Sequence, residues 1–300
     1  MQRHLGPLTA FLEGSWQVYR FWEHPPAHAA ATIKVLLVAG EFELDKRLIE
    51  TLPNLGLIAC FTSGYDRIDV SWARERGLKL SHAPGVNHEE VADMALGLML
   101  AVRRDIVSGD ALVRSGGWTP AGRPLSRAMR GQKVGIVGMG SIGQALAPRC
   151  EALGMEVRWW GPRAKPQVGG LRVESLAELA RWSDNLVIAC KVDDSNIGLI
   201  SREVIEAVGP EGLIVNVSRG QVIDEDALIE ALKSGRLGHA ALDVFVEEPT
   251  SPARWDGVPN TVLTPHTAGA TGDSVQRMLV LLMQNLAAFQ AGEALKTPIP

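Results

Sequence analysis

The stretch KVGIVGMGSIG constrains the fold of this chain more than any other part of it. It is predicted to be a strand that turns through glycines into a helix, SIGQALAPRCEALG. Gly138 permits the tight turn, Gly140 lets the backbone approach a pyrophosphate, and Gly143 lets helix and strand pack closely. The phosphates would lie at the positive helix end, beside Ser141 and Ile142. This strand, glycine turn and helix together predict a parallel α/β sheet that binds a dinucleotide.

The rest of the chain repeats the alternation of strand and helix. Short β-branched runs separated by helical stretches predict parallel strands on layered α/β sheets. Three hundred residues exceed the usual length of one domain, so two domains are expected. The predicted strands lie in IKVLLVAG, LIACFTSG and LKLSHAPG in the first third, and in KVGIVGMG, EVRWW, NLVIAC, GLIVNVS, AALDVF and TVLTPH after Gly131.

Two helices carry features that need explanation. The segment Asn87–Asp105 joins the two strand series and is apolar on nearly every face, which predicts a helix buried all round. Asn87 is its expected N-cap, and Glu90 stands three residues further on, as in a capping box. Pro148 lies inside the helix that follows the glycine turn, where it removes a hydrogen bond and is expected to kink the helix.

Composition excludes several classes of function. The formal net charge is -4 and no Lys/Arg stripe is present, which argues against nucleic-acid binding. Cys60, Cys150 and Cys190 are far apart in apolar runs, so buried reduced thiols are expected rather than a disulfide or a metal site. No apolar run is long enough to span a bilayer, and the first residues lack the order of a signal peptide. A cytoplasmic enzyme is therefore the default expectation.

The residues after the strand EVRWW bear on the choice of cofactor. Dinucleotide-binding turns are usually followed, about 20 residues on, by an acid that binds the ribose 2′-hydroxyl. Here Gly161 stands near that position, in the sequence VRWWGPRAKP. A carboxylate would repel a 2′-phosphate, whereas Arg163, with Lys165 nearby, can pair with one. We therefore predict that NADP(H) is preferred over NAD(H). The alternative is a solvated turn without a ligand.

Three further residues follow predicted strands, at the sheet edge where open parallel sheets bind ligands. They are Arg219, Glu248 and His266. A His beside a Glu can donate a proton near neutral pH, and an Arg can bind a substrate carboxylate. Taken one at a time, each residue also fits a non-catalytic role: Arg219 as a surface ion, Glu248 as a loop acid and His266 as a hydrogen-bonded structural histidine.

The chain resembles the D-isomer-specific 2-hydroxyacid dehydrogenase family over nearly its full length. The matching pieces are SGYDRID, HAPGVNHEEVADMALGLML, GQKVGIVGMGSIG, NVSRGQVIDEDALIEALKSGRLGHAALDVFVEEP and VLTPHTAGA. The resemblance implies that Arg219 binds and polarises a 2-oxoacid. It also implies that His266 donates the proton and that Glu248 holds and charges His266.

The same resemblance implies further contacts and an architecture. Ser63 and Gly64 are expected to offer N–H groups to the substrate carboxylate, and Asp243 is expected to contact the nicotinamide amide. Two Rossmann-like or flavodoxin-like α/β domains with parallel sheets are implied, with the active site in the cleft between them. Residues 1–98 with 271–300 are expected to bind substrate and residues 99–270 the dinucleotide. A homodimer is also expected, without nucleic acid, membrane or metal.

The sequence WWGPR resembles the NADPH-dependent glyoxylate/hydroxypyruvate reductase branch, which implies reduction of glyoxylate to glycolate and of hydroxypyruvate to D-glycerate. Two alternatives stay open. One is a reductase of another 2-oxoacid, such as pyruvate, a phenylpyruvate or a phosphorylated acid. The other is a non-catalytic, dinucleotide-sensing protein similar to the corepressors that share this fold. One departure from the family is Lys191, which stands where members usually have a proline.

Overall fold

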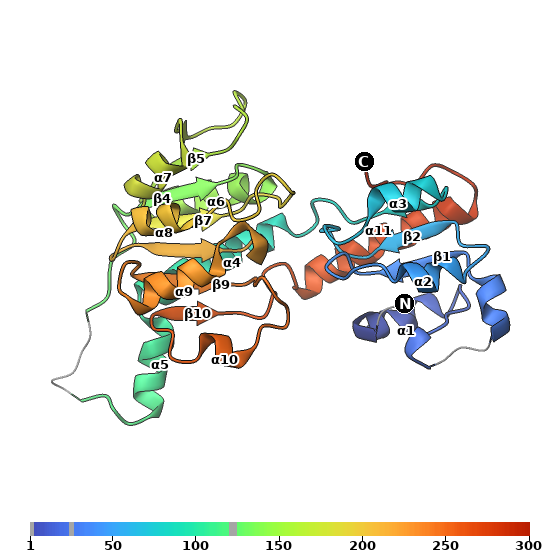
Figure 1. Ribbon diagram of the computed structural model, residues 1–300, viewed down its shortest axis with the longest axis horizontal. Helices are drawn as coiled ribbons and strands as arrows, with labels where there is room; N and C mark the ends of the chain where they lie inside the picture. Colours follow the sequence, from blue (N-terminus) through green and yellow to red (C-terminus); the bar gives the residue numbers. More distant parts are fainter. Residues whose placement is uncertain (1–2, 24–26, 120–124) are drawn as a thin grey trace. The chain divides into compact units, whose positions relative to one another are not determined.

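The computed structural model describes residues 3–23, 27–119 and 125–300, and the chain divides into two compact units (Figure 1). Unit 1 comprises Met1–Val86 with Gly272–Pro300, and unit 2 comprises Asn87–Thr271. The predicted boundary after residue 98 instead falls inside helix α4 (His88–Arg103), which belongs wholly to unit 2. The reason is packing, because α4 runs along a helix and several strands of unit 2.

Unit 1 is built on a three-stranded parallel sheet in the order β1-β2-β3. Its strands coincide with the three predicted in the first third, and helix α11 from the end of the chain contacts β2. Alternate residues point to opposite faces, so Leu57 packs with α11 through Leu282 and Leu286, while Ile58 packs on the other face. The elements are β1 (Val35–Val38), β2 (Leu57–Cys60), β3 (Lys79–Ser81), α1 (Thr9–Leu12), α2 (Lys46–Glu50), α3 (Val70–Glu75) and α11 (Gly272–Gln290).

Unit 2 is built on a seven-stranded parallel sheet in the order β10-β9-β8-β7-β4-β5-β6. The first strand of this sheet in the sequence is β4; β5 and β6 follow on one side of it, and β7 to β10 then follow on the other side. Ligands bind at such a switch point, beyond the carboxyl ends of the strands. The strands are β4 (Lys133–Val137), β5 (Glu156–Trp160), β6 (Leu171–Arg172), β7 (Asn185–Ile188), β8 (Leu213–Asn216), β9 (His239–Leu242) and β10 (Thr261–Leu263). All six strands predicted for this part are present, and the short β6 is additional.

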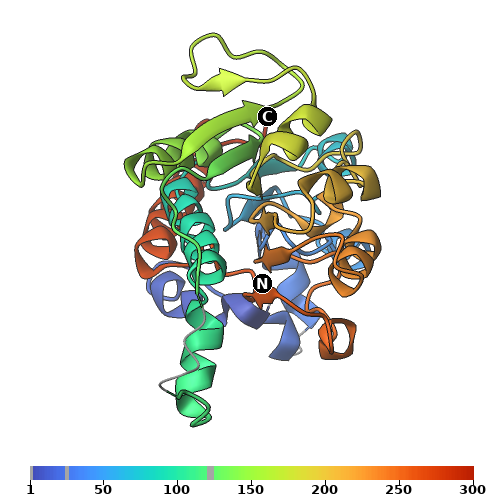
Figure 2. The ribbon, with the colours of Figure 1, turned by 90° about the vertical axis from the view of Figure 1, so that its left-hand side faces the viewer.

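Helices cover both faces of the unit 2 sheet (Figure 2). One face packs with α4 and α6, around Met99, Leu146 and Trp159, and the other packs with α7, α8 and α9. Apart from α4, the helices of this unit are α5 (Ile106–Arg114), α6 (Ser141–Ala152), α7 (Leu176–Trp182), α8 (Arg202–Val208), α9 (Glu225–Lys233) and α10 (Pro252–Trp255). Together with the parallel sheets, these layers confirm the predicted α/β class.

Of two expectations about α4, the N-cap position of Asn87 is confirmed, whereas burial on all faces is wrong. Asn87 precedes the helix, but its side chain makes no capping hydrogen bond. A Cβ atom added to Gly269 would lie 2.2 Å from Asn87 Nδ2, so this amide packs against Gly269 instead. Asp93 and Gly97 are exposed, so α4 has one solvent-facing stripe and is not buried all round.

The three cysteines are free thiols. Burial raises the pKa of Cys60 and Cys190 to about 11 and that of Cys150 to about 12. Cys60 and Cys150 are buried, as predicted, whereas Cys190 is partly exposed. In the part of the chain that the structure describes, no helix has both the length and the apolar character needed to cross a membrane.

Candidate active site

The glycine turn after β4 leaves space for a pyrophosphate. Gly138 has φ +95°, and an added Cβ would lie 2.6 Å from the Cα of Cys190. A Cβ on Gly143 would lie 2.5 Å from the Gly138 carbonyl oxygen, so only glycine fits at both positions. At Gly140, by contrast, nothing lies within 4 Å of an added Cβ. The open position adjoins the first residue of α6, Ser141, where the helix dipole favours an anion. These residues fit a dinucleotide.

The loop that follows β5 carries two basic side chains, Arg163 and Lys165. Gly138 N donates to the Trp160 carbonyl at 2.9 Å, which joins the end of β5 to the glycine turn. Lys165 Nζ donates to the Met139 carbonyl at 2.8 Å, within that turn. Arg163 is exposed. The loop GPRAKPQVGG contains no acid, so its charge is positive beside the glycine turn.

Arg172, directly after this loop, is a further basic residue that the sequence analysis did not single out. Its Nη2 atom donates to the Gly161 carbonyl at 3.0 Å, at the position where other dinucleotide sites carry an acid. Arg172 lies on β6, the one strand that was not predicted, because a two-residue strand has no periodicity of its own. In the sequence, only the positive charge of Arg172 could have indicated a role near the cofactor.

His266 and Glu248 form a close pair. His266 Nδ1 lies 2.6 Å from Glu248 Oε2, and the other carboxylate oxygen accepts a hydrogen bond from Phe245 N at 2.9 Å. The two residues follow β10 and β9, neighbouring parallel strands whose carboxyl ends share one sheet edge with the glycine turn. The contact fixes the orientation of the imidazole and leaves Nε2 as its outer nitrogen.

The pair shifts both of its pKa values in the direction of an ion pair. Burial would lower the pKa of His266, but the hydrogen bond and charge of Glu248 outweigh burial and raise it. Burial would raise the pKa of Glu248, but the hydrogen bonds from His266 and Phe245 N lower it. The charge of Arg219 lowers both pKa values. The His266 imidazole therefore stays cationic up to a higher pH than an ordinary histidine does.

Replacing Glu248 with glutamine is expected to lower the pKa of His266, because the imidazolium loses its anionic partner. The proton on His266 would then be held only at lower pH. NMR titration of ¹⁵N-labelled histidine measures this directly. Glu247→Gln is the matched control, since it removes the adjacent exposed carboxylate. A His266 titration that is the same in Glu248→Gln and in the wild type would contradict the prediction.

Asp243 anchors the loop that carries His266. Its buried carboxylate accepts hydrogen bonds from Thr264 Oγ1 at 2.6 Å, Thr267 N at 3.0 Å and Ala268 N at 2.8 Å. His266 N also donates to the Asp243 carbonyl at 2.8 Å and has φ +52°, a left-handed conformation that is rare outside glycine. Sequence reasoning missed this anchoring. The implied contact of Asp243 with nicotinamide stays a prediction.

Arg219 follows β8 and is held by its neighbours. Asn216 Nδ2 donates to the Arg219 carbonyl at 2.9 Å, and Arg219 Nη1 donates to the Ser218 carbonyl at 2.7 Å. A Cβ added to Gly220 would lie 1.9 Å from the carbonyl carbon of Phe245. The Arg219 turn therefore packs backbone to backbone against the segment that leads to Glu248, and the structure brings Arg219, Glu248 and His266 together within unit 2.

Ser63 and Gly64 belong to unit 1, in the loop after β2. Ser63 Oγ donates to the Ala83 carbonyl at 2.6 Å, and His82 Nδ1 lies 3.0 Å from the Ser63 carbonyl oxygen. These contacts fix the loop at the carboxyl edge of the unit 1 sheet. The role of this loop toward a substrate carboxylate stays a prediction. Within the described ranges, no group of three His, Cys, Asp or Glu side chains could hold a metal ion.

Comparison with known proteins identifies relatives over nearly the whole chain. Residues 96–268 match the family described as D-isomer specific 2-hydroxyacid dehydrogenase, NAD binding domain. Glyoxylate/hydroxypyruvate reductase A HPR2 of Arabidopsis thaliana is 36% identical over 98% of this chain and 96% of its own length. Hydroxyphenylpyruvate reductase of Plectranthus scutellarioides is also 36% identical over the same shares of the two chains.

A solved structure supports the same relationship. The crystal structure of an NADPH-dependent glyoxylate/hydroxypyruvate reductase from Sinorhizobium meliloti, in complex with NADP and malonate, superposes with a TM-score of 0.84. Its sequence is 34% identical, and the alignment covers 92% of this chain and 86% of that one.

Proposed function

Because the chain belongs to the D-isomer specific 2-hydroxyacid dehydrogenase family, we propose that it reduces small 2-oxoacids with NADPH, converting glyoxylate to glycolate and hydroxypyruvate to D-glycerate. The observation that carries the proposal is the 2.6 Å contact between His266 and Glu248 on the sheet edge that holds the glycine turn. A charged proton donor beside a dinucleotide site is what the reduction of a carbonyl requires.

Each residue of the site has a task in this reaction. Arg219 binds the substrate carboxylate and carbonyl, and the N–H groups of Ser63 and Gly64 bind the carboxylate. NADPH supplies the hydride to C2 when bound. His266 donates its proton to the carbonyl oxygen as negative charge develops there, and Glu248 stabilises the imidazolium before that transfer. Fixed positive charge at the developing alkoxide lowers the barrier.

NADP(H) is the proposed cofactor, in preference to NAD(H). The acid-free loop after β5, with Arg163 exposed and Lys165 on the glycine turn, supports this preference. The Sinorhizobium meliloti structure contains NADP, which agrees with it. We also place the enzyme in the cytoplasm, because three free thiols suit a reducing compartment.

A comparison of kcat/KM for NADPH and NADH with glyoxylate, hydroxypyruvate, pyruvate and phenylpyruvate tests the proposal. We expect the highest value with NADPH and one of the two small acids named first. A larger aromatic substrate is the second candidate, since the Plectranthus relative is equally similar and carries hydroxyphenylpyruvate in its name. Tight dinucleotide binding without turnover of any of these acids would favour the sensor alternative and reject an enzyme.

We propose that the enzyme is a homodimer formed through the α5 arm. The α5 helix has no buried residue and extends away from the sheet of unit 2 in both views (Figures 1 and 2). Its large apolar side chains are exposed, Ile106 to 55% and Val113 to 59%. Ile106 and Val113 are seven residues apart, so they lie on one face of the helix, and a group of exposed apolar side chains is typical of a protein interface. A second copy of the chain is the partner that we propose for it.

Aspartate at both Ile106 and Val113 is expected to convert the dimer into a monomer, because charge at an apolar interface is not solvated. Light scattering coupled to size-exclusion chromatography measures the mass. Ile197→Asp is the control, since Ile197 is exposed to 63% but lies outside the arm. A mass unaffected by the double substitution would remove α5 from the interface.

A further inference from the structure

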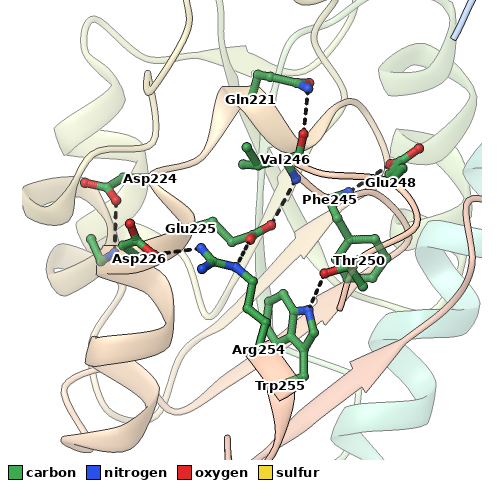
Figure 3. A network of polar contacts seen from close by, with 11 residues as sticks. Gln221, Asp224, Glu225, Asp226, Phe245, Val246, Glu248, Thr250, Arg254 and Trp255 are labelled. Atoms are coloured by element: carbon green, nitrogen blue, oxygen red, sulfur yellow. Dashed lines mark hydrogen bonds and ion pairs between the residues drawn. The ribbon is translucent and has the colours of Figure 1, made fainter. Parts of the chain in front are cut away.

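A buried carboxylate lies close to the proposed site without belonging to it. Glu225 begins α9, and its side chain is only 6% exposed. One oxygen accepts a hydrogen bond from Arg254 Nε, and the other accepts one from Val246 N at 3.0 Å (Figure 3). Burying an ionised carboxylate is costly unless it is paired. Here the contacts with Arg254 and Val246 N supply that pairing on both oxygens.

Glu225 is not needed to begin its own helix. Asp224 caps α9 by accepting a hydrogen bond from Ala227 N at 2.9 Å. The carboxylate of Glu225 points instead to the loop after β9, and Figure 3 shows it between that loop and the Arg254 side chain. Its contacts serve the loop rather than the helix.

The backbone that Glu225 holds is the backbone that holds Glu248. Phe245 N donates to Glu248 Oε1 at 2.9 Å, and the next amide, Val246 N, donates to Glu225. The Val246 carbonyl accepts from Gln221 Nε2 at 3.1 Å. Val246 is thus held at both its N–H, by Glu225, and its carbonyl, by Gln221, and the Glu248 side chain is hydrogen-bonded to the preceding amide, Phe245 N.

Arg254 connects the same carboxylate to the far end of the loop. It lies on the short helix α10 and also contacts the exposed Asp226 Oδ1 at 2.7 Å. The neighbouring Trp255 packs edge to face on Phe245, with ring centroids 5.6 Å apart, and donates from Nε1 to Thr250 Oγ1 at 3.0 Å. The two ends of the loop after β9 are therefore in contact through Phe245 and Trp255, and both are bound to Glu225, by Val246 N and by Arg254.

We propose that Glu225 and Arg254 are positioning residues, whose buried ion pair fixes the Phe245–Val246 backbone and so keeps the Glu248 carboxylate against His266. The inference rests on the proposed role of His266 as proton donor. Neither residue of the ion pair touches the reacting atoms. Both act through the position of Glu248.

Positioning and plain electrostatics predict opposite effects for Arg254→Met. The charged groups that act on His266 are Glu248, Arg219 and Asp243. Losing the positive charge of Arg254 would by itself favour the imidazolium and raise the pKa of His266 slightly. Losing the position of Glu248 would lower that pKa, because Glu248 is the group that raises it.

The test is an NMR titration of ¹⁵N-labelled histidine, with the His266 signal assigned by its loss in His266→Ala. In Arg254→Met we expect the pKa of His266 to fall by about half a unit or more. Asp226→Asn is the matched control, since Asp226 contacts the same arginine at the surface, and it should leave the titration unchanged. An unchanged or raised pKa in folded Arg254→Met would overturn the inference.

A double variant guards against loss of folding, since Arg254→Met leaves Glu225 without its counter-ion. Glu225→Leu with Arg254→Met replaces the ion pair by apolar side chains, a change that is often neutral for stability. The pKa of His266 should fall in this folded variant as well, and a wild-type titration would reject the positioning role. The NMR readout needs no turnover, so a wild-type protein inactive with 2-oxoacids would reject the proposed function alone.

Discussion

Replacing His266 with alanine is expected to lower kcat for 2-oxoacid reduction by about 10²–10⁴-fold, the range that general acid–base catalysis contributes. The forming alkoxide would lose its proton donor and a positive charge together. Affinity for NADPH should change little, because His266 contacts Glu248 and the Asp243 loop rather than the glycine turn. Steady-state kinetics measures kcat, and quenching of tryptophan fluorescence measures cofactor binding.

A second variant separates chemistry from backbone strain at this position. His266 has φ +52°, a conformation that alanine adopts poorly and asparagine more readily. His266→Asn therefore removes the proton donor while keeping the loop, and it should be as inactive as His266→Ala. His28→Ala, which removes an exposed histidine of unit 1, is the control for a general effect. Substantial turnover in His266→Asn would remove His266 from the mechanism.

Changing Gly161 to aspartate and Arg163 to alanine together is expected to move the kcat/KM ratio of NADPH to NADH by about 100-fold or more toward NADH. A hydrogen bond to a charged group contributes about 1.5–3 kcal/mol, so the loss of Arg163 weakens a phosphate contact by roughly 10-fold to 150-fold. The new carboxylate repels the phosphate and accepts from the ribose hydroxyls.

The site can accommodate this aspartate. A Cβ on Gly161 would lie 3.6 Å from the Trp159 ring, an ordinary contact. Failure to switch would thus reflect chemistry rather than packing. Arg181→Ala, which removes an exposed arginine of α7, should leave the ratio unchanged. If the double variant kept the wild-type cofactor ratio, the loop after β5 would not be the phosphate site.

The sequence predicted those parts of the fold that depend on local pattern. Nine strands of the structure coincide with predicted ones, because apolar runs of this length bounded by Gly or polar residues identify buried parallel strands. The parallel order then brings their carboxyl ends to one edge, so Arg219, Glu248 and His266 follow strands of one sheet. The resemblance to a family assigned roles that local pattern could not distinguish from surface charges.

Features that depend on distant partners were not predictable. The amide of Asn87 packs against Gly269, far along the chain, so a capping pattern that was correct locally gave a bond that is not made. The two-residue strand β6 exists only through its pairing with Arg158 and Trp159 of β5. Likewise, nothing near Asp243 or Glu225 in the sequence indicates which loop amides their buried carboxylates hold.

The discontinuity of unit 1 has a consequence for synthesis on the ribosome. The core of unit 1 needs Met278, Leu282 and Leu286 of α11, which are translated after all of unit 2. Unit 2 is one continuous segment and can fold as soon as it has emerged, since domains generally fold as units during translation. Until α11 is translated, the apolar face of β1 and β2 can therefore be covered only in part, by Leu5, Leu8 and Leu12 from the start of the chain.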